Sequence, residues 1–328
     1  MCKRTAGVIL LPVKMQSNTP GRGDRRLHKL SRRARNSIEL YLIMLPVVVL
    51  IFTFSYIPIY GVLIAFQDYR PGVPFIGPDA RWVGLKNFRE FVNSFYFDRI
   101  LRNTVTLSFL NLIMGFWVPI VFAVFLNEIR GGRVRKTMQT VSYLPHFISA
   151  VVMAGFVLTF ISSDGLISEI AGLFGFQIRA ISSNADAFKW VYVITNIWKG
   201  FGWSSILYLS SMASIDPELY EAASMDGATR LRKMYHITLP FITPLIIIQL
   251  IFAIGSMMTS NTELILLLYN NAVLKSADVF GTYVYREGLV GGRFSFGSSV
   301  NFMQTSMNFL LIFAANKICD RLTNFSLW

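Results

Sequence analysis

The sequence is poor in charged residues. Asp, Glu, Lys and Arg make up 15% of its 328 residues, whereas soluble globular proteins carry about a quarter. Hydrophobic residues account for 53%, with 28 phenylalanines, and they are gathered in long blocks. This distribution excludes an ordinary soluble domain and predicts a protein that crosses a membrane several times.

Cysteine and histidine are also scarce. The two cysteines, Cys2 and Cys319, lie near opposite ends of the chain, so no disulfide framework is predicted. The three histidines, His28, His146 and His236, lack the spacing that is typical of metal ligands, and we expect no metal site.

No motif of a membrane hydrolase or an ATPase is present. HExxH and GxSxG are missing, so we predict no catalytic residues. The glycine spacing of a Walker A loop occurs in 292–298, but the lysine that would bind phosphate is lacking. Any ATP hydrolysis that drives this protein must therefore occur on another chain. Isolated carboxylates such as Asp164, Asp278 and Glu287 are expected to be solvated loop residues.

Residues 1–37 form a basic, mostly polar tail in which Asp24 is the one acidic residue. The apolar patch 6–13 is too short to cross a membrane and lacks a cleavage site of small residues, so no cleaved signal peptide is expected. We interpret the tail as a flexible cytoplasmic segment that touches anionic membrane lipid. A nucleic-acid-binding arm is disfavoured because aromatic residues and a folded reader are missing.

Six apolar blocks follow the tail, and each is close to the ~20 residues that a helix needs to cross the hydrocarbon. They predict an all-α, polytopic membrane bundle over residues 38–328, with helices at 39–66, 103–127, 139–162, 188–212, 240–267 and 299–317. Lys and Arg are more frequent in the segments on the side of the N-terminus. By the positive-inside rule, both termini are then cytoplasmic.

Between the fourth and fifth predicted spans lies a polar stretch with helix-forming character, 216–240. Asp216 can cap a helix, and Pro217 suits the first helical position. Gly227 permits a backbone turn that most residues resist. The stretch predicts a helix–turn–helix elbow on the cytoplasmic side, and its second half contains the basic residues Arg230, Arg232 and Lys233.

Three blocks inside this elbow resemble the EAA loop of binding-protein-dependent ABC permeases. They are Glu221-Ala222-Ala223, Asp226-Gly227-Ala228 and Ile237-x-Leu239-Pro240. Relatives usually carry Phe at the position of Met234, for which Met is a flexible apolar substitute. The resemblance implies a coupling helix that docks in a cleft of an ATPase subunit. Its coupling residues would be Glu221, Ala222, Ala223, Asp226 and Gly227.

Other patches are similar to the LplB-like branch of sugar permeases, and this resemblance covers about residues 38–328. They are 82–88, 102–104, 126–130, 143–149, 282–286 and 326–328. The resemblance implies the six-helix fold of a type I ABC importer permease. Gly281 and the pair Asn261-Thr262 depart from the pattern expected of that branch and bear on substrate or binding-protein detail.

The resemblance also implies partners. This chain would be a multi-pass protein of the bacterial cytoplasmic (inner) membrane and would import oligosaccharides, with acidic fragments of polysaccharides among the candidates. It would work with a second homologous permease, an extracytoplasmic solute-binding protein and two ABC ATPase subunits. ATP and Mg would be bound by the ATPases, so this chain is expected to hold no cofactor and to be no enzyme.

An alternative function is a membrane scaffold or receptor that docks partners through the tail and the elbow. Polar stripes within the predicted spans argue against it, because a scaffold needs no hydrophilic path.

Polar residues inside spans are candidates for the substrate path, because polar groups are costly in lipid and tend to face the bundle interior. Asn196, Gly200 and Trp203 recur at i, i+4 and i+7 and share one helix face. By distance from the EAA loop, maltose-type relatives point to Asn196, Gly200 and Trp203 before the loop, and to Ser256, Met257 and Ser260 after it. Asn308 belongs to a polar stripe of the sixth span.

The chemistry of these residues suits a sugar, because an indole face stacks on a pyranose ring and short polar groups bind hydroxyls. Helix–helix packing is the alternative role. Lys199 lies near the middle of the fourth span and leaves three interpretations open. It can lose its proton, bond backbone carbonyls or a carboxylate of the partner permease, or face the cavity and attract an anionic substrate.

Overall fold

The computed structural model describes residues 38, 40–129, 131–174, 181–323 and 326–327. The predictions for the tail 1–37 lie outside this range. The chain divides into two units, Met1–Tyr60 and Gly61–Trp328, and each is described by itself. The predicted domain boundary between residues 37 and 38 stays a prediction.

The described part of the first unit is an apolar helix. It belongs to a helical stretch, Leu40–Phe66, that includes the π segment η1 (Phe52–Tyr56) and the 3-10 segment η2 (Ile57–Phe66). Every described residue from Leu40 to Tyr60 is exposed. A helix that is apolar all round and unburied within its own chain requires lipid or another protein around it.

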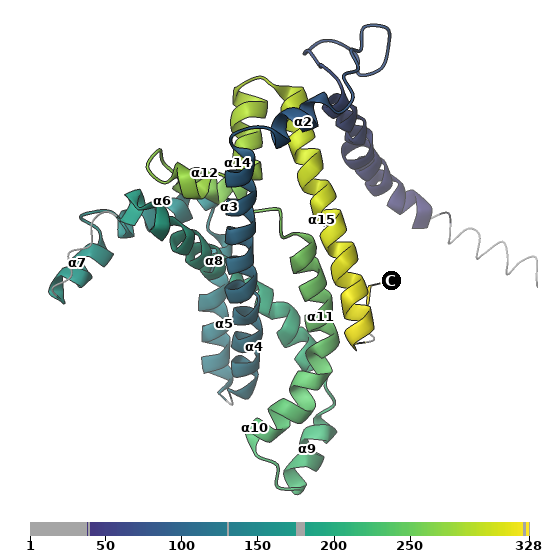
Figure 1. Ribbon diagram of the computed structural model, residues 1–328. Coiled ribbons are helices and arrows are strands. Elements are labelled where there is room, and N and C mark those ends of the chain that lie inside the picture. The colour runs from purple at the N-terminus through teal and green to yellow at the C-terminus, as the bar shows by residue number, and fades with distance from the viewer. Residues whose placement is uncertain (1–37, 39, 130, 175–180, 324–325, 328) are drawn as a thin grey trace, which may run out of the picture. The chain divides into compact units, whose positions relative to one another are not determined.

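The second unit is built on α8 (Ala185–Ala213) and its neighbours. Helix α3 (Phe97–Leu110), the π segment η3 (Asn111–Gly115) and α4 (Trp117–Glu128) form one long stretch, and α4 packs on α8. Helix α5 (Gly132–Phe147) packs on α8 as well (Figure 1). The contact is close, because a Cβ atom at Gly202 would lie 2.0 Å from the Ser142 carbonyl oxygen.

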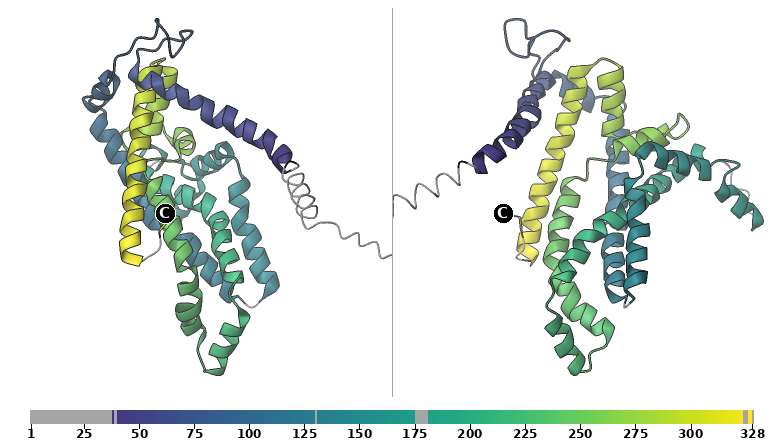
Figure 2. Two further views of the ribbon diagram at one scale, coloured as in Figure 1. Left: turned by 90° about the vertical axis from the view of Figure 1, so that its right-hand side faces the viewer. Right: turned by 180° about the vertical axis from the view of Figure 1, so that it is seen from behind.

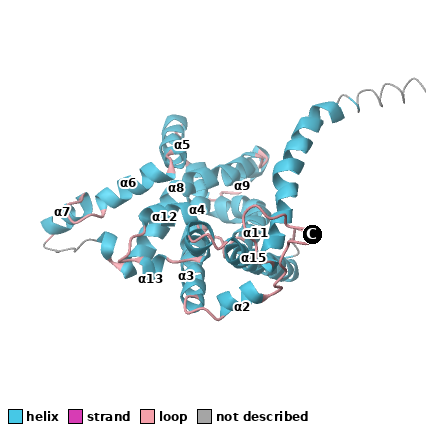
Figure 3. Ribbon diagram, turned by 90° about the horizontal axis from the view of Figure 1, so that it is seen from above, coloured by secondary structure: helices cyan, strands magenta, loops and turns pink. Residues whose placement is uncertain are grey.

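Helix α11 (Leu239–Gly255) runs beside α15 (Phe294–Thr323) (Figure 2). Helix α6 (Ala150–Phe160) is bent by 101° from α5 and continues to α7 (Leu166–Leu173). Seen from above, α6 and α7 extend away from α11 and α15 (Figure 3). Short elements complete this unit: α2 (Lys86–Val92), η4 (Ile181–Ser183), α12 (Thr262–Leu268), α13 (Leu274–Ala277), α14 (Phe280–Tyr283) and the π segment η6 (Val284–Val290).

The predicted elbow is confirmed as a structure. It consists of α9 (Pro217–Met225), α10 (Arg230–Lys233) and the π segment η5 (Met234–Thr238), which leads into α11. The carboxylate of Asp216 accepts the Glu218 N–H at 2.9 Å and caps α9. Gly227 makes the turn with φ of 73°, a value that favours glycine.

The all-α membrane class is confirmed, and the count of six spans stays a prediction. Among the described residues, three helices are long and apolar enough to cross a membrane, or four if the bent pair α5 and α6 is one span. Helices α8 and α15 have 29 and 30 residues, so they are long enough to cross. Asn, Ser and Lys residues in both helices lower their mean hydropathy, which explains why they are not among the apolar ones.

Two predicted spans were wrong in detail. The span at 139–162 is divided between α5 and α6, where the Ser149 hydroxyl accepts the Val152 N–H at 3.3 Å and caps α6. The span at 240–267 ends at Gly255, and α12 starts only at Thr262. We call residues Ser256–Asn261 the break segment. Ser, Thr and Asn compete with the helix by bonding nearby backbone groups, and they make up most of it.

Candidate functional site

A cavity of about 460 Å³ lies between η3, α8 and the break segment. Its polar lining consists of amide and hydroxyl side chains, among them Asn111, Asn196, Ser256, Ser260 and Asn261. A second cavity of about 600 Å³ adjoins it, since Phe116, Pro119 and Ser256 line both. In the part of the chain that the structure describes, no charged side chain lines either cavity.

The helical hydrogen bonds stop at the start of the break segment, where the Ser256 N–H still donates to the Phe252 carbonyl at 3.0 Å. Residues of other helices supply the bonds that follow. The Met258 N–H donates to Asn308 Oδ1 at 2.8 Å, and Gln304 Nε2 donates to the Met258 carbonyl at 2.7 Å. The Asn261 N–H donates to the Tyr192 hydroxyl at 3.0 Å. Non-helical backbone at membrane depth is tolerated where protein buries it or where it lines a cavity, and both conditions hold here.

A chain of three side-chain amides crosses the cavity wall. Asn196 Nδ2 donates to Asn111 Oδ1 at 2.9 Å, and Asn261 Nδ2 donates to Asn196 Oδ1 at 3.2 Å. Asn111 opens the π segment η3, and such segments are frequent at functional sites. Our sequence analysis missed the role of Asn111 and Asn261 here. A lone Asn inside the apolar run of the second span was the signal that could have found Asn111.

Ser260 is the lining residue that points most directly to a ligand. It is 9% exposed, and its hydroxyl has no hydrogen-bond partner within the described protein. Buried polar atoms almost always have a partner. Because this hydroxyl is itself hidden from solvent, it can bond a molecule that enters the cavity once the Ser260 side chain rotates toward it.

The structure brings most of the predicted path residues together. Five of them line the first cavity, namely Asn196, Gly200, Ser256, Met257 and Ser260. Trp203 lines the second cavity. Lys199 and Asn308 line neither cavity. The ammonium of Lys199, on a half-buried residue of α8, makes no hydrogen bond or ion pair with another described residue.

One face of the Trp203 indole is already covered. The His146 ring stacks on it with a centroid distance of 4.5 Å and an interplanar angle of 3°. The Phe147 ring meets the indole edge-on at 5.7 Å. Trp203 can therefore offer a sugar only its opposite face.

The elbow presents its predicted coupling residues outward. Glu221, Ala222, Asp226 and Gly227 are exposed, and Ala223 is half-buried. The Tyr220 and Thr238 hydroxyls lie 2.9 Å apart and join α9 to η5, so the elbow is connected to the start of α11. A cleft of about 340 Å³ beside it is lined by Ala223, Asp226, Ala228, Arg232, Lys233, His236 and Ile237.

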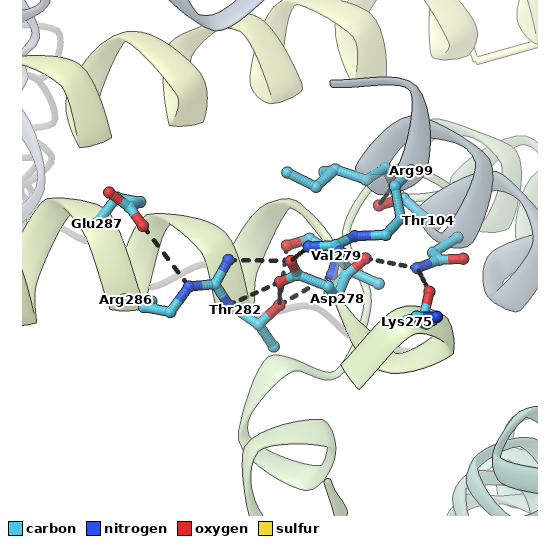
Figure 4. A network of polar contacts seen from close by, with 10 residues as sticks. Arg99, Thr104, Lys275, Asp278, Val279, Thr282, Arg286 and Glu287 are labelled. Carbon is cyan, nitrogen blue, oxygen red and sulfur yellow. Dashed lines mark hydrogen bonds and ion pairs between the residues drawn. The ribbon is translucent and has the colours of Figure 1, made fainter. Parts of the chain in front are cut away.

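Asp278, which we expected to be solvated, is completely buried (Figure 4). Its carboxylate accepts both Nη atoms of Arg286, at 3.0 and 2.9 Å, and Nη2 of Arg99 at 2.9 Å. The Thr282 hydroxyl donates to it at 3.0 Å. Burial acts to lower the pKa of Arg286, but the hydrogen bonds and charge of Asp278 outweigh this effect and raise the pKa. The expectation failed because one of the two arginines, Arg99, lies 179 residues away in the sequence and is brought to Asp278 only by the fold.

Gly281 and Thr262, which both depart from the LplB-like pattern, lie against each other in the structure. A Cβ atom at Gly281 would lie 1.9 Å from Thr262 Oγ1. Glycine at one position therefore accommodates threonine at the other.

Comparison with known proteins gives consistent matches. The family model described as "Binding-protein-dependent transport system inner membrane component" matches residues 115–278. The polygalacturonan/rhamnogalacturonan transport system permease protein YteP of Bacillus subtilis is 38% identical over 305 residues, which cover 91% of this chain and 94% of YteP. Protein LplB of the same organism is 40% identical over 284 residues, or 86% of this chain and 88% of LplB.

A solved structure agrees with the fold. The chain is similar to one in the crystal structure of a bacterial alginate ABC transporter in complex with alginate pentasaccharide-bound periplasmic protein. The TM-score is 0.80 at 34% identity, and the match covers 91% of this chain and 100% of that chain.

Proposed function

The chain belongs to the family of binding-protein-dependent transport system inner membrane components, and on that premise we propose that it is the permease subunit of a bacterial ABC importer for oligosaccharides. The observation that carries the proposal is the first cavity. It combines a helix break, a wall of amides and the unpartnered hydroxyl of Ser260. Transporters bind polar substrates at such discontinuous helices.

The substrate class follows from the lining and the relatives. Amides and hydroxyls form hydrogen bonds with sugar hydroxyls, and the free face of Trp203 can stack on a ring. The names of relatives refer to polygalacturonan and to the acidic polysaccharide alginate, which supports acidic oligosaccharides. Because the described lining of both cavities is uncharged, carboxylates would be bound by neutral N–H and O–H donors. Lys199 is not required for this recognition.

The partners follow from the same premise. An extracytoplasmic solute-binding protein would deliver the sugar, as in the alginate transporter that was solved with its periplasmic protein. A second homologous permease would complete the path. Two ATPase subunits, which bind ATP and Mg, would dock on the exposed elbow and drive the two bundles between outward-facing and inward-facing states. The Lys and Arg distribution supports cytoplasmic termini, and this orientation would put the elbow on the ATPase side. The alternative of a scaffold or receptor leaves the polar cavity without a purpose.

The test is uptake by the complete transporter in proteoliposomes. We expect ATP-dependent uptake of labelled oligogalacturonides or alginate oligosaccharides, in competition with neutral oligosaccharides of equal length. Ser260→Ala should raise KM about five- to tenfold, because the substrate loses a buried hydrogen bond. Ser306→Ala is the matched control, since that hydroxyl bonds to Phe302 of its own helix. If no oligosaccharide of any kind is imported, the proposed function is wrong.

Lys199→Met tests whether the substrate carboxylates are bound by neutral N–H and O–H donors or attracted by the Lys199 ammonium. We expect acidic and neutral oligosaccharides to compete in this variant as they do in the parent. A selective loss of acidic substrate would show that Lys199 attracts the carboxylates, and recognition by neutral donors would fail.

A further inference from the structure

We propose that Gln304 and Asn308 are positioning residues that set the affinity for substrate without touching it. They hold the break segment in the shape that presents Ser256, Met257 and Ser260 to the first cavity. This inference rests on the proposed function, since it assigns the affinity of the same cavity to residues outside its lining.

Both side chains hydrogen-bond to the backbone of one residue of the break segment, Met258. Asn308 Oδ1 accepts the Met258 N–H at 2.8 Å, and Gln304 Nε2 donates to the Met258 carbonyl at 2.7 Å. Asn308 Nδ2 also donates to Thr259 Oγ1 at 2.7 Å. Gln304 and Asn308 are one turn apart on α15 and share a face. We call this pair the clamp.

The clamp is separate from the cavity, yet close to it. Gln304 and Met258 are each 7% exposed, so the bond between them is hidden from solvent, whereas the bonds of Asn308 are half-buried or exposed. Neither Gln304 nor Asn308 lines the first or the second cavity, whereas Thr259 lines the first one. Each clamp residue therefore hydrogen-bonds directly to the break segment, part of which lines the first cavity.

Other bonds that fix the break segment lie at its two ends, where the Ser256 N–H donates to the Phe252 carbonyl at 3.0 Å and the Asn261 N–H donates to the Tyr192 hydroxyl at 3.0 Å. Its internal backbone bonds are of the turn type, such as the Thr259 N–H to the Ser256 carbonyl at 2.8 Å. A segment without a helical ladder that is released from its clamp samples more conformations. Substrate would then have to order it on binding, and this cost appears as a weaker affinity. We therefore expect clamp variants to raise KM more than they lower the maximal rate.

The donor and acceptor roles of the two amides predict different effects for the same kind of substitution. At Gln304 the amide donates, so the ionised carboxylate of Gln304→Glu puts an acceptor against the Met258 carbonyl and breaks the bond. At Asn308 the amide oxygen accepts from Met258, so Asn308→Asp keeps this bond, and its second oxygen can accept from the Thr259 hydroxyl. The same chemical change should therefore damage one position and spare the other.

The experiment compares Gln304→Glu, Asn308→Leu and Asn308→Asp with the parent in the complete transporter. Asn301→Asp is the matched control, because Asn301 is an exposed amide of the same helix. Kinetics are measured with the oligosaccharide that the parent imports best. We expect KM to rise about five- to tenfold in Gln304→Glu and Asn308→Leu, and to stay near the parent value in Asn308→Asp and Asn301→Asp.

A second readout needs no sugar. Met257→Cys reports the order of the break segment through its rate of reaction with N-ethylmaleimide. We expect Gln304→Glu and Asn308→Leu to change that rate in the empty transporter, and Asn308→Asp to leave it unchanged. A parent that imports no oligosaccharide would refute the proposed function alone, since the reaction rates still report on the clamp.

The clamp proposal is overturned by either of two results. In one, all three clamp variants lower the maximal rate and the thermal stability together while KM stays the same, which is the behaviour of a merely structural pair. In the other, neither KM nor the maleimide rate responds to Gln304→Glu or Asn308→Leu.

Discussion

Asp278→Asn should destabilise the part of the second unit in which α3, the end of α13 and η6 meet. The substitution keeps the shape of the side chain and removes its charge. Asp278 is completely buried, whereas the side chains of Arg99 and Arg286 are 26% and 31% exposed. The variant would therefore leave two half-buried guanidinium groups facing one another without a counter-charge.

The size of the effect follows from the geometry. Each arginine has an Nη2 atom 2.9 Å from the same Oδ2 oxygen of Asp278. The two cations are thus within about 6 Å, where unit charges repel by roughly 3 kcal/mol at an effective dielectric constant of about 20. Water reaches both arginines and screens part of this repulsion. We expect a net loss of about 2–3 kcal/mol, somewhat less than for a fully buried pair that loses one partner.

The assay is the apparent thermal midpoint of the purified protein in detergent. A loss of this size should lower the midpoint by about 5–8 °C. Asp164→Asn is the control, because Asp164 is an exposed carboxylate and its loss should be almost neutral. Adding Arg99→Gln to Asp278→Asn should restore part of the stability by removing one of the two cations. Equal midpoints for Asp278→Asn and Asp164→Asn would refute this reasoning.

Three further predictions concern the helix contact, the elbow and the second cavity. Gly202→Ala places a Cβ atom 2.0 Å from a carbonyl oxygen of α5 and should cost about 1–3 kcal/mol in the same thermal assay. Gly200→Ala, with nothing within 4 Å, should melt like the parent, and equal losses would contradict the packing. Gly227→Val forces a β-branched residue to φ of 73° and should abolish substrate-stimulated ATP hydrolysis in an inserted complex; unchanged stimulation would show that this turn does not couple. Trp203→Ala should reduce uptake far more than His146→Ala, whereas equal losses of uptake and stability in both would show that the ring merely packs.

The elbow could be predicted from the sequence because its structure is local. A capping Asp216, a proline at the first helical position and a glycine at the turn act within a few residues of one another. The apolar blocks likewise predict helices from composition alone. These parts of the fold depend little on what packs against them.

The break segment could not be predicted because its stability comes from distant residues. Hydrophobic character continues through the two methionines, so the sequence resembles an uninterrupted span. The break exists because Gln304 and Asn308 bond its backbone from another helix. Asp278 was misjudged for the same reason, since its partner Arg99 lies 179 residues earlier in the chain. A loop carboxylate looks solvated until the fold brings its cations to it.

The central claim is that the oligosaccharide passes through the first cavity. A thiol placed in this cavity, which bound substrate would protect, tests the claim most directly. Gly200 lines this cavity, and a Cβ atom there has nothing within 4 Å, so Gly200→Cys should fold normally in a background where Cys2 and Cys319 are serine. In the reconstituted transporter, reaction of this thiol with N-ethylmaleimide should block ATP-dependent oligosaccharide uptake. The imported oligosaccharide should slow the reaction. If the fully modified transporter imports at the parent rate, the substrate does not pass through this cavity.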